Sequence, residues 1–421
     1  MEYTNDLNFK KNFLWNVIGT SLNAFNSLFF MIIVTRINGL NDSGIFTLAF
    51  SLACLLCIIG GYEGRVFQVT DIKKEFNDKE YIIHRFITTF LMMIIAFLYT
   101  RIQNYDFEKT LITLLLCLMK GLEVIADVFY GILQRNNCLY KVGISLTIKS
   151  ILSVICFFVI DKVTNNLLIS CLTLVIVWLV VLVVYDIVNS IVLIDTKEKI
   201  NKKNILLLFK SGFFAFSILF LSMYLINAPK YALDGRVSEE LQAIFGIILM
   251  PATVISLCAQ YLLQPFLAKM SASYKNGNRN MFKKIVNLIM VIIILIGVFA
   301  FVACWILGIP ILNIIYNVNL DEYKTPLLII IIGAILYSLG TLYSTALTTM
   351  RKTFVQFIIY IISSVFGLIV SIILIEKYAL LGASLAYFSI MLLQFILYIL
   401  YYHLVINKVS FSKCEEIIYE N

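Results

Sequence analysis

The feature that most constrains this chain is a near-continuous series of apolar stretches, each about as long as one membrane-spanning helix. An apolar run of roughly 20 residues crosses a bilayer as an α-helix, because a helix satisfies its own backbone hydrogen bonds in lipid. The charged residues that a water-soluble surface needs are scarce, at 14% of the 421 residues against 61% hydrophobic. A soluble domain typically carries about 25%. The chain is therefore predicted to be an all-α integral membrane protein.

Twelve spans are predicted, with short polar connections between them. They lie near residues 12–35, 44–66, 82–100, 110–132, 142–160, 167–190, 205–228, 240–266, 283–308, 326–350, 354–375 and 379–404. The charged segment DTKEKINKKN at 195–204 divides them into six plus six. Many membrane transporters are built from two such repeats. The sequence thus predicts an N-terminal six-helix lobe at 1–200 and a C-terminal six-helix lobe at 201–421.

The distribution of basic residues predicts how the spans are oriented. Lys and Arg gather in alternate connecting segments, beginning before the first span. The segment after the second span, for example, holds Lys73, Lys74, Lys79 and Arg85. Cytoplasmic loops of membrane proteins carry an excess of Lys and Arg. Both termini are therefore expected in the cytoplasm, which agrees with an even number of spans.

The short connections exclude several classes of protein. None is long enough for a soluble catalytic domain, and no glycine-rich phosphate loop occurs in the sequence. The two histidines, His84 and His403, and the nine cysteines form no cluster at metal-ligand spacing, so neither a metal nor a cofactor is expected. The formal net charge of +8 follows from the basic loops, and nucleic acid is not an expected partner.

Charged side chains inside the spans are the candidate functional residues. A charge near the bilayer centre costs roughly 2.5 kcal/mol or more, so it normally faces a protein interior or a hydrated cavity. The fourth span contains Lys120, Glu123 and Asp127 on one helical face, and Lys149 and Lys210 lie in the fifth and seventh. Two interpretations stay open for the fourth span: a hydrated, net basic cavity for an anionic group, or a buried Lys–carboxylate pair between helices. Lys149 is expected to line a cavity, whereas Lys210 either lines it or extends its amine to the cytoplasmic interface.

Uncharged polar side chains follow two further spans at helical spacing. They are Asn16, Thr20, Asn23 and Ser27 in the first span and Ser338, Thr341, Thr345 and Thr348 in the tenth. Small hydroxyl residues pack helices together in membranes. Hydroxyl and amide groups also bind sugars. Helix packing is the ordinary role of such stripes, and contact with a ligand is the alternative.

Four segments of the sequence resemble the Wzx-type polysaccharide-repeat-unit flippases, members of the multidrug/oligosaccharidyl-lipid/polysaccharide exporter superfamily. They are FLWNVIGTSLNAFNSLFFMIIVTRI at the first span, GGYEGRVFQVTDIKKEF after the second, YGILQRNNCLYKVGISLTIKS between the fourth and fifth, and INAPKYALDGRVSEELQAIFGIILMPATVIS across the seventh and eighth. The resemblance covers essentially the whole chain, and the last segment is the most specific.

The resemblance implies a fold, a function and a location. The family fold is two six-helix lobes around a central cavity, and it works by alternating access. The implied function is to carry a polyprenyl-diphosphate-linked oligosaccharide from the inner to the outer leaflet of the bacterial cytoplasmic membrane, for O-antigen or capsule export. The implied partners are membrane lipids, a polysaccharide polymerase and assembly proteins. Relatives carry basic residues at places comparable to Arg65, Arg36 and Lys230, which are therefore expected to bind substrate.

Three other functions fit parts of the sequence. A small-molecule antiporter on the same fold would use Glu123 and Asp127 for ion coupling, but the lysines would repel cationic drugs. A membrane enzyme such as a polysaccharide polymerase usually needs a long extracytoplasmic loop with catalytic residues. The permease of an ATP-driven exporter would need a separate ATPase.

Overall fold

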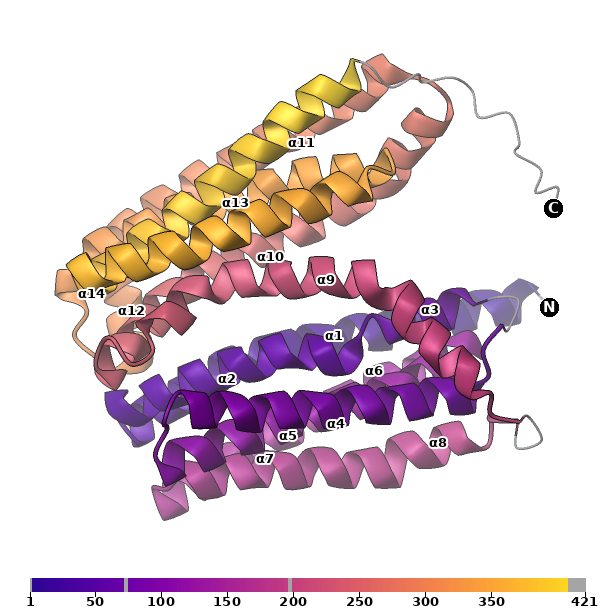
Figure 1. Cartoon of the computed structure of the whole chain (residues 1–421), viewed down its shortest axis with the longest axis horizontal. Helices are drawn as coiled ribbons and strands as arrows, with labels where there is room; N and C mark the ends of the chain where they lie inside the picture. Colours follow the sequence, from indigo (N-terminus) through magenta and orange to yellow (C-terminus); the bar gives the residue numbers. More distant parts are fainter. Residues whose placement is uncertain (1, 72–74, 196–198, 408–421) are drawn as a thin grey trace. The chain divides into compact units, whose positions relative to one another are not determined.

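The computed structural model describes residues 2–71, 75–195 and 199–407, with side chains from Lys10 onward. Throughout these ranges the chain consists of helices joined by short turns, without a β-strand (Figure 1). Ten of the described helices are long and apolar enough to cross a membrane, judged by length and composition. The prediction of an all-α, multi-pass membrane protein is confirmed.

Two helices explain how ten such helices agree with twelve expected spans. α14 (Thr353–Ile406) has 54 residues, which is about 80 Å of helix against a hydrocarbon thickness of about 30 Å. Its backbone breaks at Ala379, with φ 47° and ψ −122°, so α14 contains two spans. α5 (Phe107–Arg135) is the expected fourth span, and it is not among the ten because Lys120, Glu123 and Asp127 interrupt its apolar run.

The chain divides into two compact units. The first comprises Met1–Phe220 with Ser238–Ala243, and the second comprises Leu221–Val237 with Ile244–Asn421. Helices α9 (Lys202–Leu233) and α10 (Glu239–Lys275) contribute residues to both units. The predicted division into six-helix lobes at 1–200 and 201–421 is based on sequence repeats and not on compact units. It stays a prediction.

The first unit is a bundle in which α1 packs along α6 and α2 packs along α5 (Figure 1). Its elements before α9 are α1 (Glu2–Ile37), α2 (Leu40–Gly61), α3 (Gly64–Thr70), α4 (Asp78–Ile102), α5, α6 (Leu139–Thr164), α7 (Leu167–Val181), a π-helical turn (Leu182–Ile187) and α8 (Val188–Ile191). α1 and α6 meet at glycines. A Cβ atom on Gly143 would lie 2.2 Å from the carbonyl carbon of Trp15, and one on Gly19 would lie 2.3 Å from the Gly143 carbonyl oxygen. Small residues of this kind let membrane helices approach closely.

The second unit is built around the contact of α13 with α11 and α14. Its elements after α10 are α11 (Arg279–Ala303), a π-helical turn (Cys304–Gly308), α12 (Ile309–Tyr316), a 3₁₀ turn (Asp321–Tyr323), α13 (Lys324–Thr349) and α14. Apolar and aromatic side chains fill the contact, with the rings of Tyr343 and Tyr402 at 5.1 Å between centroids. Van der Waals packing of this kind is what associates helices in lipid.

Replacing Gly143 by alanine is predicted to destabilise the first unit. The added methyl group would overlap the backbone of α1, and relief requires the two helices to move apart. We expect a loss of about 1–3 kcal/mol in stability, seen as a lower midpoint of thermal unfolding in detergent. Gly340→Ala is the matched control, because a Cβ atom there has its nearest neighbours at 3.9 Å. Equal midpoints for the two variants would contradict the close approach of α1 and α6.

Candidate functional site

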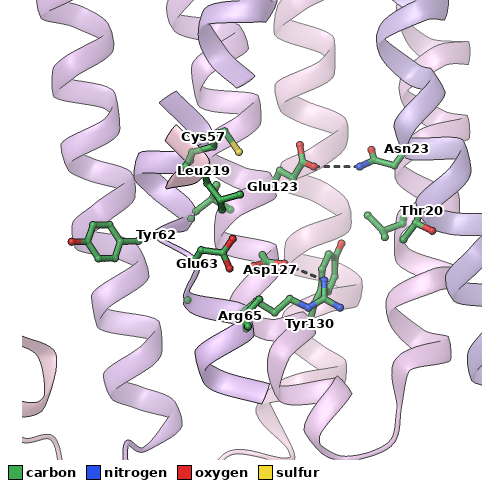
Figure 2. A pocket seen from close by; sticks show the side chains of 16 residues that line it. Thr20, Asn23, Cys57, Tyr62, Glu63, Arg65, Glu123, Asp127, Tyr130 and Leu219 are labelled. Atoms are coloured by element: carbon green, nitrogen blue, oxygen red, sulfur yellow. Dashed lines mark hydrogen bonds and ion pairs between the residues drawn. The ribbon is translucent and has the colours of Figure 1, made fainter. Parts of the chain in front are cut away.

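A polar cavity of about 440 Å³ lies inside the first unit (Figure 2). Residues of α1, α2, α3, α5 and α6, of the α2–α3 connection and one residue of α9, Leu219, line it. Its ionisable lining side chains include Glu63, Arg65, Glu123 and Asp127, and Asn23 adds an amide. The structure therefore brings together Arg65, Glu123 and Asp127, three of the residues that the sequence singled out.

The cavity is built where the chain of the second span breaks. Tyr62 and Glu63, between α2 and α3, both have left-handed backbone conformations, with φ of 45° and 52°. The break leaves helix-end carbonyl groups without partners along α2. Arg85 of α4 supplies the partners, because its guanidinium Nη1 donates to the carbonyl oxygens of Gly60 and Gly61. The interruption is thus stabilised by a cation from a neighbouring helix.

Asp127 of α5 is shared between two arginines. Its Oδ1 lies 3.2 Å from Nη1 of Arg65, and its Oδ2 lies 3.3 Å from Nη2 of Arg85. The two arginines differ in environment: the side chain of Arg85 is 2% exposed, whereas that of Arg65 is 27% exposed. Arg65 also donates from Nε and Nη2 to Oε1 of Gln134, at 3.1 and 2.9 Å. Arg85 is therefore structural, and Arg65 is the arginine that reaches the cavity.

Lys120 and Glu123 form an ion pair within α5. The Nζ of Lys120 lies 2.6 Å from Oε2 of Glu123, and the other carboxylate oxygen accepts a hydrogen bond from Asn23 of α1 at 3.2 Å (Figure 2). Lys120 also lines a smaller cavity of about 230 Å³, together with Ser27 and Trp178. The Lys–carboxylate pair therefore lies within α5 and not between helices, and the binding of an anionic group at this face stays a prediction.

Lys149 of α6 lies in a buried ion pair. Its Nζ is 2.5 Å from Oδ2 of Asp186 in the π-helical turn after α7, and both side chains are fully buried. The ammonium also donates to the hydroxyl of Tyr130 at 2.8 Å and lies 4.8 Å from the centroid of the Trp178 ring. Tyr130 lines the 440 Å³ cavity, so Lys149 reaches that cavity through Tyr130. Its predicted contact with substrate stays a prediction.

The remaining basic candidates lie elsewhere. Arg36 is exposed in the last turn of α1, next to the start of α2, whereas Arg65 follows the end of α2. Lys230 is buried in the last turn of α9, in the second unit. Lys210 is exposed near the start of α9 and lines a separate groove. The structure does not place Arg36 beside Arg65.

The two polar stripes differ in what their side chains contact. In the first span, Thr20 and Asn23 line the 440 Å³ cavity, and Asn23 and Ser27 line the smaller one. In the tenth, each hydroxyl donates to the carbonyl four residues earlier in its own helix; these are Ser338, Thr341, Thr345 and Thr348. The first stripe thus borders both cavities, although the Thr20 hydroxyl also donates to a carbonyl of its own helix, that of Asn16, at 2.6 Å. The hydroxyls of the second stripe are satisfied locally.

The expectation of a net basic cavity does not hold for the 440 Å³ cavity. Among its described lining residues, Glu63, Glu123 and Asp127 accompany Arg65. Lys120 and Lys149, close by, each have a carboxylate partner. A charge in a low-dielectric interior is costly unless it is paired, and α5 and the turn after α7 supply the counter-charges.

Sequence reasoning missed two residues of this site. Arg85 was assigned to the cytoplasmic segment after the second span, yet its side chain is buried. Asp186 was not singled out, although it is the only charged residue in the apolar run at 167–190. That isolation was the available signal, because a lone carboxylate in a span needs a partner from another helix.

Comparisons with known proteins agree with this architecture. No protein-family model matches the chain. The capsular polysaccharide biosynthesis protein CapF of Staphylococcus aureus is 27% identical over 404 residues, which cover 93% of this chain and 98% of that protein. An inward-facing multidrug resistance MATE family transporter of the MOP superfamily superposes with a TM-score of 0.75 at 13% identity, covering 95% of this chain and 100% of that one. Lipid II flippase MurJ, in an inward closed conformation, superposes with a TM-score of 0.72 at 16% identity, covering 92% and 87%.

These similarities confirm the predicted resemblance and the fold class. The chain has the helical fold of the MOP superfamily, which is the exporter superfamily that the sequence resembles. The similarity to CapF extends along nearly the whole of both chains. The roles of the individual site residues stay predictions.

Removing either member of the Lys149–Asp186 pair is predicted to destabilise the first unit. A single removal leaves an uncompensated buried charge, which costs about 3–5 kcal/mol. Lys149→Met and Asp186→Leu are each expected to lower the midpoint of thermal unfolding in detergent, and the double variant is expected to recover most of the loss. Lys162→Met, at an exposed position of the same helix, is the control. A Lys149→Met protein of normal stability that has lost only transport would instead place Lys149 on the substrate.

Proposed function

We propose that this protein is a flippase that translocates a polyprenyl-diphosphate-linked oligosaccharide from the inner to the outer leaflet of the bacterial cytoplasmic membrane. It serves the synthesis of capsule or a related surface polysaccharide, and it works as a transporter by alternating access rather than as an enzyme. The similarity to CapF and the fold shared with the lipid II flippase support this function. With both termini in the cytoplasm, Arg65 lies at the inner end of the second span, where the substrate enters.

The observation that carries the proposal is the sharing of Asp127 between Arg65 and Arg85. When Arg65 turns to an anionic ligand, Asp127 keeps Arg85 as its partner. No carboxylate is then left alone in the interior, which would be the costly outcome. A guanidinium also binds two phosphate oxygens at once through parallel N–H bonds. Arg65 therefore exchanges Asp127 for a diphosphate with only a small loss of free energy.

The neutral polar lining suits the sugar part of such a substrate. Thr20 and Asn23 present a hydroxyl and an amide to the 440 Å³ cavity, and Asn26 and Trp178 line the adjoining smaller one. Ligand sites generally combine apolar and aromatic walls with a few polar groups that fix orientation. The two cavities share Asn23, so a ligand that extends from one to the other keeps contact with polar groups.

Glu63 carries the opposite charge to Arg65, so substitutions at the two positions should change transport in opposite directions. Its carboxylate lines the same cavity and, among the described residues, makes no hydrogen bond or ion pair (Figure 2). A negative charge there disfavours a diphosphate, whereas the guanidinium of Arg65 favours it. Neutralising the two side chains should therefore affect an anionic substrate in opposite directions.

Arg65→Gln and Glu63→Gln are predicted to change translocation oppositely. Liposomes containing the purified protein would receive a fluorescent polyprenyl-diphosphate oligosaccharide, and a lectin or quencher on the far side would report the exposed sugar. Loss of a charge-assisted hydrogen bond removes about 1.5–3 kcal/mol, which is roughly a ten- to hundredfold lower rate for Arg65→Gln below saturation. Glu63→Gln should equal or exceed the wild-type rate.

Arg101→Gln is the control. Arg101 is exposed at the far end of α4, so this variant should transport normally. Protein-dependent exposure that is insensitive to Arg65→Gln would refute the role of this arginine. Absence of any exposure, with the natural glycan and under several imposed ion gradients, would refute the flippase function.

A small-molecule antiporter is the second candidate, because three carboxylates line the cavity. A cationic substrate would need Glu63, Glu123 and Asp127, the last two being the residues expected to couple ions. In that case Glu63→Gln would abolish the uptake of a cationic dye into proteoliposomes, and Arg65→Gln would leave it intact. The two functions thus predict opposite rankings of transport activity for the Arg65→Gln and Glu63→Gln variants.

A further inference from the structure

A second concavity, the α9 groove, borders the polar cavity at Tyr62. The groove has a volume of about 710 Å³. Tyr62 forms part of its wall, and one face of α9 forms most of the rest. That face consists of Lys203, Leu206, Leu207, Lys210, Phe213 and Phe214. Tyr62 lines both the groove and the cavity, so the two are adjacent at this residue.

The α9 face is apolar with two cationic positions. Its residues recur at intervals of three and four, which places them on one side of the helix. Leu206 is 72% exposed and Phe214 is 55% exposed, so the face is open. Lys203 and Lys210 are also exposed, and neither forms an ion pair with a residue that the structure describes. The face therefore offers a large apolar area and two ammonium groups that have no counter-charge among the residues that the structure describes.

Tyr62 fixes this part of α9 to the broken second span. Its ring stacks on Phe216 with 4.6 Å between centroids, and its hydroxyl donates to the carbonyl oxygen of Phe209 at 3.0 Å. In Figure 2 the ring projects away from Asp127 and Arg65. The residues on one side of Tyr62 are thus polar and charged, and those on the other side are apolar with two lysines.

We infer that the α9 groove binds the first isoprene units of a polyprenyl diphosphate, with Lys203 and Lys210 near the diphosphate. This inference rests on the proposed function and adds a site for the lipid part of the substrate. A lipid-linked oligosaccharide joins an apolar chain, an anionic diphosphate and a polar glycan in that order. The protein presents the matching order: the apolar face of α9 with its lysines, then Tyr62, then Arg65 and the polar cavity.

The charge of the ligand separates this occupant from ordinary lipid. A phospholipid tail also fits an exposed apolar face, but a neutral phospholipid gains nothing from two lysines. A diphosphate carries more negative charge than the single phosphodiester of an anionic phospholipid, so it interacts more strongly with both ammonium groups. Binding at this groove should therefore depend on the diphosphate and on the lysines together.

Photocrosslinking tests the inference directly. The full chain, in lipid nanodiscs, would carry a photoreactive amino acid in place of Leu207 and would be exposed to a labelled long-chain polyprenyl diphosphate without sugar. We expect saturable labelling that unlabelled polyprenyl diphosphate displaces at least tenfold more readily than polyprenol or an anionic phospholipid. Lys203→Gln with Lys210→Gln should reduce the labelling several-fold, and both positions are exposed, so folding should be preserved.

The control position is Phe90 of α4, which is 70% exposed. Labelling there should not saturate and should not respond to the lysine variants. Equal displacement by polyprenol, equal behaviour at Leu207 and Phe90, or indifference to both lysine substitutions would each overturn the inference. Such a failure leaves the flippase function standing if the liposome assay shows translocation that depends on Arg65. Specific crosslinking without translocation would instead refute the flippase function alone.

Discussion

Pairing of charges inside an apolar bundle is the constraint on which the first unit depends. A charged side chain in such an interior needs a partner, and Arg85, Lys120 and Lys149 each have a carboxylate partner on another turn or another helix. Arg85 joins α4 to Asp127 of α5 and to the end of α2, while Lys149 joins α6 to Asp186 after α7. These contacts fix the rotation of each helix about its axis, which apolar packing alone specifies weakly. Asp127 lines the cavity, and Lys149 reaches it through Tyr130.

The break between α2 and α3 is what places Arg65 beside these pairs, in the lining of the cavity. A continuous helix would use its own carbonyl groups and would leave Arg85 with only Asp127. Because the backbone φ angles of Tyr62 and Glu63 are positive, the chain changes direction there and the side chains that follow face new neighbours. Tyr62 contacts α9, and Arg65 reaches Asp127 and Gln134. One local interruption therefore links the cation of the cavity, the helix end held by Arg85 and the position of α9.

The membrane spans could be predicted from the sequence, but the ion pairs between helices could not, for a physical reason. The length of an apolar run determines whether it crosses a bilayer, and the i, i+3 spacing alone predicts that Lys120 and Glu123 meet. Lys149 and Asp186 belong to different spans, so their contact depends on the register between two helices, which local sequence does not encode. Arg85 was misplaced for a related reason: next to the end of an apolar run, the same residue faces either water or the neighbouring helix. The break after Gly60 and Gly61 was visible only as a pair of glycines.

The absence of a net basic charge in the described cavity is better suited to a flippase than the charge that was expected. In a cavity of unpaired cations, the side chains would repel one another when the cavity is empty and would bind a diphosphate too tightly for release. Transport requires binding that is favourable on entry and weak enough on exit. An arginine that exchanges between Asp127 and a ligand avoids both problems, because the carboxylate competes with the phosphate for the same guanidinium. Arg85 keeps Asp127 neutralised in either state. In the proposed function, the free energy of substrate binding at Arg65 is the difference between two ion pairs, and a small difference is what a reversible carrier needs.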